Sequence, residues 1–305
     1  MSEPGDGRAA GPVSGPDEKA WAVTRRQTLR ITAVTGLGLV LGGGLVRALV
    51  RRAGLHRVSE TRARLGTLVS LTAVHPEPEG ARAVVAAGFA EMERLEAILS
   101  RHASGTAMWR LNEQGRLEAV PPELRTVLRE ARRFHVLTDG AFDPTVAPVL
   151  ELWAGRHRRG EGPPDDAAVR RAVERVGFDG VEMDGAGVRF ARPGMSLTLD
   201  GIAKGFVVDR TVEALAGAGA ERVMVDAGGD MASGGRGAAD EPWTVGVQDP
   251  HRASGSLGRV RLAGQAVATS GDYMQSFTQN RRHHHIVDPR TGRSPEHTSS
   301  VTVVA

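Results

Sequence analysis

The sequence predicts an α+β fold, in which amphipathic helices and short strands follow one another without a regular βα alternation. Apolar residues at helical spacing recur between residues 78 and 176, and most β-type runs lie after residue 180. No G-x-G-x-x-G motif follows a predicted strand and no P-loop motif occurs, which excludes Rossmann and P-loop domains. The chain also contains no internal repeat of fixed period.

The first predicted elements follow from spacing and from turn residues. Gly66–His75 (GTLVSLTAVH) is a strand, because its apolar residues stand in a run rich in Thr, Ser and Val. Pro78–Leu99 has the apolar spacing of a helix, and Pro122–Leu137 begins with prolines that suit a first helical turn. Asp165–Val176 is a third helix, with acidic residues near its positive end.

The later elements are one helix and a series of short strands. The helix spans Ile202–Ala216 and is followed by glycines that can cap it. The β-type runs lie around Val181 and at Val188–Phe190, Ser196–Leu199, Arg222–Val225, Trp243–Val247, Gly258–Leu262, Val267–Thr269 and Ser299–Ala305. The folded domain is therefore expected over residues 64–305.

Composition excludes several classes of site. The chain has 305 residues, of which 40% are hydrophobic, enough for one large core or two smaller ones. It has no cysteine, which excludes disulfides, thiolate metal sites and a cysteine nucleophile. A metal would be held by His, carboxylate, hydroxyl or carbonyl groups, and a hard cation such as magnesium fits the oxygen ligands.

The positive charge of the chain is concentrated at its N-terminus. Residues 1–60 hold nine Lys and Arg against five Asp and Glu, whereas the remainder holds 30 against 31. Without a basic face, and with one tyrosine to stack on bases, no nucleic-acid partner is expected.

The N-terminal segment is predicted to be a targeting segment. Residues 1–23 are a disordered leader, rich in Gly and Pro, and residues 51–63 are a linker. Between them, residues 24–50 place TRRQTLR before a glycine-rich apolar stretch, which is similar to a twin-arginine signal. An ordinary membrane anchor with positive-inside arginines is the alternative. In both cases the folded domain is expected on the extracytoplasmic (periplasmic) side of the cell membrane, exported in the first case by the twin-arginine route.

Two stretches hold residues that suit phosphate chemistry or a turn. In GAFDPTV the proline fixes Asp143 in a turn, where its carboxylate either caps a helix or serves a site. In TLDGIAKGFVVD, Lys204 stands in the first helical turn, where free N–H groups and the dipole favour a phosphate. Lys204 and Lys19 are the only lysines of the chain.

Three later stretches add glycines, hydroxyls and histidines. Val225–Gly235 (VDAGGDMASGG) and Val267–Met274 (VATSGDYM) fit either close approach to a ligand or ordinary polar turns. In HHHIVDPRTG, adjacent residues of an extended segment point to opposite faces, so three consecutive histidines do not suit one zinc site. The pattern favours a single histidine poised for proton transfer, next to Asp288.

The order of these stretches resembles the ApbE family, the FAD:protein FMN transferases. GAFDPTV, DGIAKG, GGD, ATSGDY and HHIVDPRTG follow one another as they do in that family, and Gly66–Thr67 and Leu99–Asn112 agree. The resemblance implies an ApbE-like two-lobed domain with mixed sheets and flanking helices, with the flavin between the lobes. It implies magnesium-assisted transfer of FMN from FAD to a Thr or Ser hydroxyl of a target flavoprotein of an electron-transfer chain, with release of AMP.

The resemblance also implies a set of site residues. Proton transfer to or from the acceptor hydroxyl falls to His285, with Asp288 as the second catalytic candidate, and the carbonyl of Gly201 contributes to the magnesium site. The implied FAD-binding positions are Leu65, His102, Ala141, Phe142, Asp143, Thr198, Lys204 and Ile286.

Several positions depart from the family pattern. Leu65 stands in place of a frequent Met, His102 in place of a Tyr that packs on the flavin, and Thr198 in place of an Asp. Either Asp200, two residues beyond Thr198, supplies that carboxylate from a shifted position, or this chain belongs to a subgroup that does without it. The family pattern continues past Ala305 into a helix whose Asp and Thr complete the magnesium site, so we expect that the C-terminal end is missing here.

Two other functions use the same residues. A non-catalytic FAD-binding or assembly protein would keep the pocket without the metal. A magnesium-dependent FAD pyrophosphatase would use water as the acceptor and release FMN and AMP.

Overall fold

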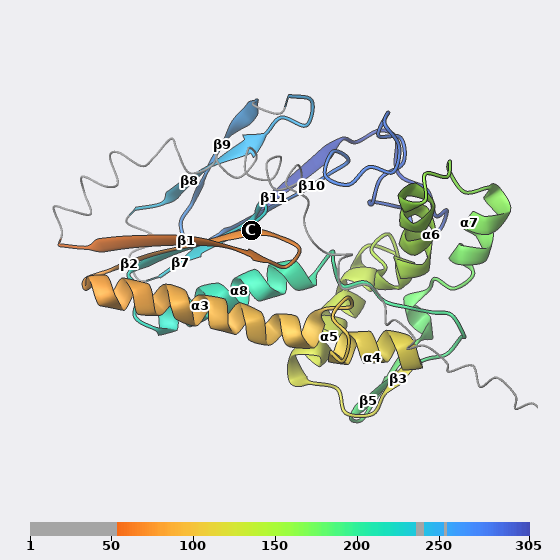
Figure 1. Ribbon diagram of the computed structural model, residues 1–305, viewed down its shortest axis with the longest axis horizontal. Helices are drawn as coiled ribbons and strands as arrows, with labels where there is room; N and C mark the ends of the chain where they lie inside the picture. Colours follow the sequence, from red (N-terminus) through yellow and green to blue (C-terminus); the bar gives the residue numbers. More distant parts are fainter. Residues whose placement is uncertain (1–53, 236–240, 253–254) are drawn as a thin grey trace, which may run out of the picture.

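The computed structural model describes residues 54–235, 241–252 and 255–305 (Figure 1). The predicted leader (1–23) and the signal or anchor segment (24–50) lie outside these residues. Residues 56–64, however, form strand β1 (His56–Arg64), so the predicted linker is wrong over that stretch. The side chains of β1 are mostly polar or charged and none is buried, and they lack the apolar alternation from which a strand is predicted. No helix of the described part is long and apolar enough to cross a bilayer.

The largest sheet has six strands in the order β1, β2, β6, β7, β10 and β11. After β1 these are β2 (Thr67–His75), β6 (Arg222–Ala227), β7 (Asp230–Gly234), β10 (Ala266–Gly271) and β11 (Ser300–Val304). All pairings within it are antiparallel, and Leu71 of β2 lies opposite Val225 of β6. The central strand β6 is buried at every residue, which fits its apolar sequence.

Two helices cover one face of this sheet and build the main core. They are α3 (Pro78–Leu99) and α8 (Ala203–Gly217), which lie side by side (Figure 1). The helices approach closely at Gly88, where a Cβ atom would lie 2.8 Å from Leu215 Cδ2 and 2.9 Å from Leu71 Cδ1. A glycine in the middle of α3 costs helix propensity, and here it makes room for the side chains of its neighbours.

The other helices form a second group beyond the C-terminal end of α3 (Figure 1). They are α4 (Ala107–Gln114), α5 (Pro122–Leu137), α6 (Ala147–Arg158) and α7 (Asp166–Val173), with short 3-10 turns at Pro144–Val146 and Phe178–Gly180. A small antiparallel sheet joins β3 (Arg116–Leu117), β5 (Gly187–Phe190) and β4 (Val181–Asp184), and β8 (Trp243–Gln248) pairs with β9 (Ser256–Leu262). The α+β class with flanking helices is confirmed.

The predicted strand at Ser196–Leu199 is wrong. The segment joins no sheet of the described residues, because its backbone is bonded elsewhere. The N–H of Leu197 donates to Asn112 Oδ1 (2.8 Å), and the N–H of Thr198 donates to the carbonyl of Pro144 (2.8 Å). These bonds tie the start of the α8 turn to the segment that follows Asp143.

Candidate active site

The turn that leads into α8 carries Gly201 and Lys204. The N–H groups of Ile202 and Ala203 donate to the carbonyl of Leu199, at 2.9 and 2.7 Å, which closes the turn at the start of the helix. Lys204 is the second residue of α8, and its Nζ lies 2.7 Å from Asp230 Oδ2. The lysine is therefore held at the positive end of a helix, where an anion is favoured.

The hairpin between β6 and β7 places Asp230 against Lys204. The buried carboxylate of Asp226 accepts a hydrogen bond from the N–H of Gly229 (3.0 Å). Burial raises the pKa of Asp226, while the Gly229 N–H and the charge of Lys204 act in the opposite direction. Gly228 has a positive φ of 66°, and a Cβ built on it would lie 2.3 Å from Thr67 Oγ1. The glycines of VDAGGD are thus required by the turn that presents Asp230.

His285 lies near this lysine in the loop that precedes β11. Its N–H donates to the carbonyl of Gln275 (3.0 Å), and its ring Nδ1 lies 3.2 Å from the same oxygen. A carbonyl only accepts hydrogen bonds, so the neutral ring carries its proton on Nδ1 and leaves Nε2 as an acceptor.

The protonation state of His285 follows from its surroundings. Burial lowers the pKa of His285, and the charge of Lys204 acts in the same direction. The Gln275 carbonyl and the carboxylate of Asp200 oppose this shift. The neutral imidazole, which can accept a proton, is therefore favoured at neutral pH.

The two neighbouring histidines, His283 and His284, contact other residues of the fold. His283 stacks on Trp153 with ring centroids 4.5 Å apart. His284 is 2% exposed, and its N–H donates to Ser294 Oγ (2.9 Å). His283 and His285, which alternation would place on one face, therefore have different surroundings, and of the three histidines His285 is the one that lies near Lys204.

Asp288 is part of the turn that follows His285. Its carboxylate accepts a hydrogen bond from the N–H of Arg290 (2.9 Å), and its carbonyl accepts one from the N–H of Gly292 (2.8 Å). Within residues 255–305, which the structure describes, no hydrogen bond joins Asp288 to His285. The structure thus gives Asp288 a role in shaping the loop, and its catalytic role stays a prediction.

The predicted flavin stretch lies against the α8 turn. Phe142 Cε2 lies 3.2 Å from the position of a Cβ built on Gly201, and Ala141 beside it is exposed. The buried carboxylate of Asp143 accepts hydrogen bonds from the N–H of Thr145 (2.8 Å) and the N–H of Phe178 (3.1 Å). Asp143 therefore shapes the loop, while Ala141 and Phe142 are the members of the stretch that can face a ligand.

An ion-pair chain that the sequence does not predict runs along this site. Arg101 lies 3.5 Å from Asp200 Oδ2 and 3.2 Å from Glu151 Oε1 of helix α6. Burial lowers the pKa of His102, with Arg101 acting in the same direction and Asp200 opposing it. Asp200 therefore lies close enough to influence both His102 and His285. No local pattern pairs Arg101 with partners so distant in the sequence.

The remaining predicted positions lie in turns and loops. Leu65 occupies the β1–β2 turn with a positive φ of 53°, and its N–H donates to the carboxylate of Glu96. Thr198 is buried, and its hydroxyl accepts a hydrogen bond from the N–H of Asp200 (3.3 Å). Ile286 is half-buried beside His285. Thr198 therefore stabilises the turn, and Asp200 supplies the carboxylate there.

The predicted metal site is incomplete among the described residues. The carbonyl of Gly201 is available at the α8 turn, with Asp200 beside it. The described part, however, contains no group of three or more His, Cys, Asp or Glu side chains that could hold a metal ion. Magnesium usually keeps several waters and is held by one or two carboxylates and by substrate phosphates, so the Gly201 carbonyl and Asp200 would supply part of its shell.

Trp153 of α6 anchors the histidine loop and gives a test of its rigidity. Its Nε1 donates to the carbonyl of Gly292 (2.9 Å) while its ring stacks on His283. Trp153→Phe leaves that buried carbonyl unpaired, so we expect a loss of about 1–3 kcal/mol in the free energy of unfolding, measured in urea. Amide exchange in residues 283–292 should also accelerate.

Trp243 provides a matched control for this change. Its buried Nε1 has no hydrogen-bond partner among the described residues. Trp243→Phe therefore replaces an indole of the same size without breaking a hydrogen bond from its Nε1. Amide exchange in residues 283–292 should remain as in the parent protein. Equal exchange in that loop for both variants would contradict the anchoring role of Trp153.

Comparison with known proteins identifies relatives of the chain. Residues 65–305 match the model of the ApbE family. A Haemophilus influenzae protein named FAD:protein FMN transferase is 32% identical over 234 residues, which cover 70% of this chain and 67% of that protein. A Vibrio cholerae protein of the same name is 33% identical over 209 residues, 66% of this chain and 62% of that protein. The chain thus spans about two thirds, or less, of the length of these curated relatives.

Two solved structures share the fold. The ApbE protein of Thermotoga maritima superposes with a TM-score of 0.74 at 30% identity, covering 82% of each chain. The flavinyl transferase ApbE of Pseudomonas stutzeri, in its apo form, superposes with a TM-score of 0.69 at 27% identity. That match covers 82% of this chain and 80% of the other. The antiparallel sheet with α3 and α8 described above therefore belongs to an architecture already observed in flavin transferases.

Proposed function

We propose, because the chain belongs to the ApbE family, that it is an FAD:protein FMN transferase. The observation that carries the proposal is the position of His285, with an acceptor nitrogen, near the lysine at the start of α8. The flavin stretch lies against the same turn. A phosphate-binding lysine and a proton acceptor together suit phosphoryl transfer to a hydroxyl group.

The reaction makes one phosphorus–oxygen bond and breaks another. The Thr or Ser oxygen of the acceptor protein attacks the phosphorus on the FMN side of the FAD pyrophosphate. The bond from that phosphorus to the bridging oxygen breaks, and AMP leaves with the bridging oxygen and its electron pair. His285 Nε2 takes the hydroxyl proton, and Lys204 balances phosphate charge.

The proposal includes magnesium, an acceptor and a location. Magnesium, when bound, would neutralise charge on the pyrophosphate, and the Gly201 carbonyl is one donor to it. The acceptor is a flavoprotein of an electron-transfer chain. The TRRQTLR segment and the apolar stretch after it support export by the twin-arginine route, with membrane association through that segment on the extracytoplasmic side.

Mass spectrometry of an acceptor domain tests this function. The domain is incubated with the chain, FAD and magnesium, with chelator in a parallel tube, and FAD binding is followed by fluorescence. A gain of one FMN and the appearance of AMP are expected. FMN and AMP without a modified acceptor would indicate a pyrophosphatase instead. Bound FAD with no products would indicate a non-catalytic FAD-binding protein.

A further inference from the structure

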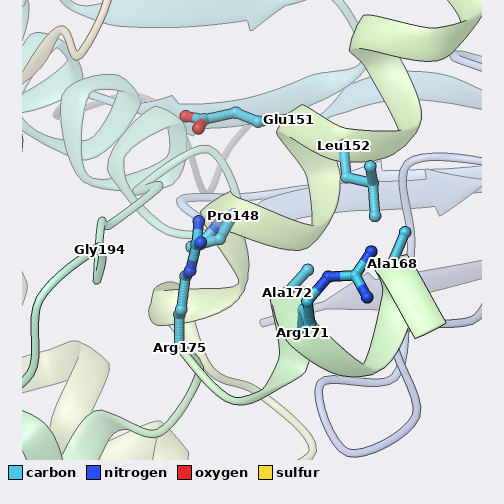
Figure 2. A pocket seen from close by; sticks show the side chains of 8 residues that line it. All are labelled: Pro148, Glu151, Leu152, Ala168, Arg171, Ala172, Arg175 and Gly194. Carbon is cyan, nitrogen blue, oxygen red and sulfur yellow. The ribbon is translucent and has the colours of Figure 1, made fainter.

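Helices α6 and α7 enclose a hollow of about 380 Å³ that the proposed reaction does not use (Figure 2). We call it the α6–α7 hollow. Its lining is aliphatic along both helices and charged at its margin, with no aromatic ring. The residues that line it are Pro148, Glu151, Leu152, Ala168, Arg171, Ala172, Arg175 and Gly194.

Two arginines of the hollow form no ion pair within the part of the chain that the structure describes. Arg171 and Arg175 are exposed and reach from the α7 side toward α6 (Figure 2). Neither forms an ion pair or a side-chain hydrogen bond with any residue that the structure describes, whereas Glu151 is paired with Arg101. The hollow therefore presents two guanidinium groups that form no ion pair within the described residues, although the Ala168 N–H and the charge of Arg171 both act to lower the pKa of Asp165.

The backbone at Gly194 makes room for one of these arginines. Gly194 has a φ of 78°, and a Cβ built on it would lie 3.1 Å from both Cδ and Nε of Arg175. Any larger residue would crowd the arginine stem, and its backbone would be strained. The loop thus leaves space for Arg175 beside the hollow.

The hollow adjoins the flavin site in two ways. The 3-10 turn that Asp143 caps leads directly into the first turn of α6, where Pro148 lines the hollow. Glu151, which also lines it, connects through Arg101 to Asp200 at the α8 turn. The hollow is therefore linked to the α8 turn through Glu151 and Arg101.

We propose that the α6–α7 hollow binds an acidic segment of the acceptor protein, next to the hydroxyl that receives FMN. This inference rests on the proposed transferase function. Carboxylates pair well with guanidinium groups, and the aliphatic floor suits small apolar side chains. A nucleotide is disfavoured, because no ring lines the hollow to stack on a base. Free positive charge near the site would also steer an acidic partner toward it.

Charge reversal in the full chain tests the docking site. The Arg171→Glu, Arg175→Glu double variant is compared with Arg170→Glu, which changes an exposed neighbour on α7 that does not line the hollow. The probe is a fluorescein-labelled peptide of alternating Glu and Ala, and its binding is measured by fluorescence anisotropy at two salt concentrations. We expect the double variant to weaken binding about 30-fold or more and Arg170→Glu to weaken it less than about twofold.

Two results would overturn the proposal. One is an equal loss of affinity per reversed charge in the double variant and in Arg170→Glu, and the other is no binding of the peptide by the parent chain. If the double variant fails to fold, as judged by circular dichroism, the Arg171→Gln, Arg175→Gln pair replaces it.

A transfer assay separates this proposal from the function on which it rests. With an acceptor that the parent chain modifies, the double variant should raise KM for the acceptor about tenfold, with kcat and the Kd for FAD unchanged. Unchanged KM would refute the docking site while leaving the transferase function in place. Peptide binding that depends on Arg171 and Arg175, without any FMN transfer by the parent chain, would refute the transferase function, and the segment could not then be assigned to an acceptor.

Discussion

His285→Ala is expected to slow FMN transfer by about 10²–10⁴-fold while leaving FAD bound nearly as in the parent protein. The change removes the Nε2 acceptor, and it leaves in place the Lys204–Asp230 pair and the Phe142 contact with the α8 turn. Single-turnover transfer with saturating FAD measures the chemical step, and fluorescence titration measures FAD affinity separately. The exposed His297 of the same loop region supplies a control, because His297→Ala should transfer at the parent rate. Transfer by His285→Ala at the parent rate would remove His285 from the mechanism.

The pH profile gives a second measurement of the same role. Since burial and Lys204 lower the pKa of His285, the imidazole is neutral and competent at pH 7. The rate of FMN transfer should therefore not depend on the protonation of His285 at neutral pH and above. The rate should fall as the pH drops through the lowered pKa of His285. Lys204→Met removes a nearby positive charge, so this fall should begin at a higher pH in that variant. A fall that begins above pH 7 in the parent protein would show that another group controls it.

Lys204→Met is expected to raise the Kd for FAD by about 10–100-fold, the range for loss of a hydrogen bond to a charged group. Lys204 is the second residue of α8 and is held by Asp230, so its charge lies where a phosphate is favoured. Fluorescence titration of FAD measures the effect. Lys204→Arg keeps the charge and should bind FAD more tightly than Lys204→Met does. Parent-like FAD affinity in Lys204→Met would exclude a phosphate contact for this lysine.

Local pattern is sufficient to predict the helices that position the site. The bounds predicted for α3 and α5 agree with the structure, because each has apolar residues at helical spacing and a proline at its start. Helices α4 and α6 were not predicted. The first is only eight residues long, and the second, APVLELWAGRHR, has weak amphipathic spacing.

Long-range contacts in the site cannot be predicted from local pattern. The order of motifs indicated three parts of the site: the stretch around Phe142, the turn that carries Lys204 and the loop that carries His285. The structure places the first two in contact. It places the histidine near the lysine. The Asp200–Arg101–Glu151 chain and the Asp230 partner of Lys204 depend on how distant segments meet. Likewise, the sequence does not show that Thr198 and Asp143 accept hydrogen bonds from backbone N–H groups of their turns, because these bonds depend on the folded backbone.

The Lys204–Asp230 pair also gives the site a chemical reporter. Apart from Lys19 and the N-terminal amine, Lys204 is the only primary amine of the chain. An acylating reagent of moderate reactivity therefore has one target in the folded domain, and a bound pyrophosphate would shield that target. The extent of labelling at Lys204, compared with and without FAD, thus reports occupancy of the nucleotide site without a spectroscopic probe or a substitution.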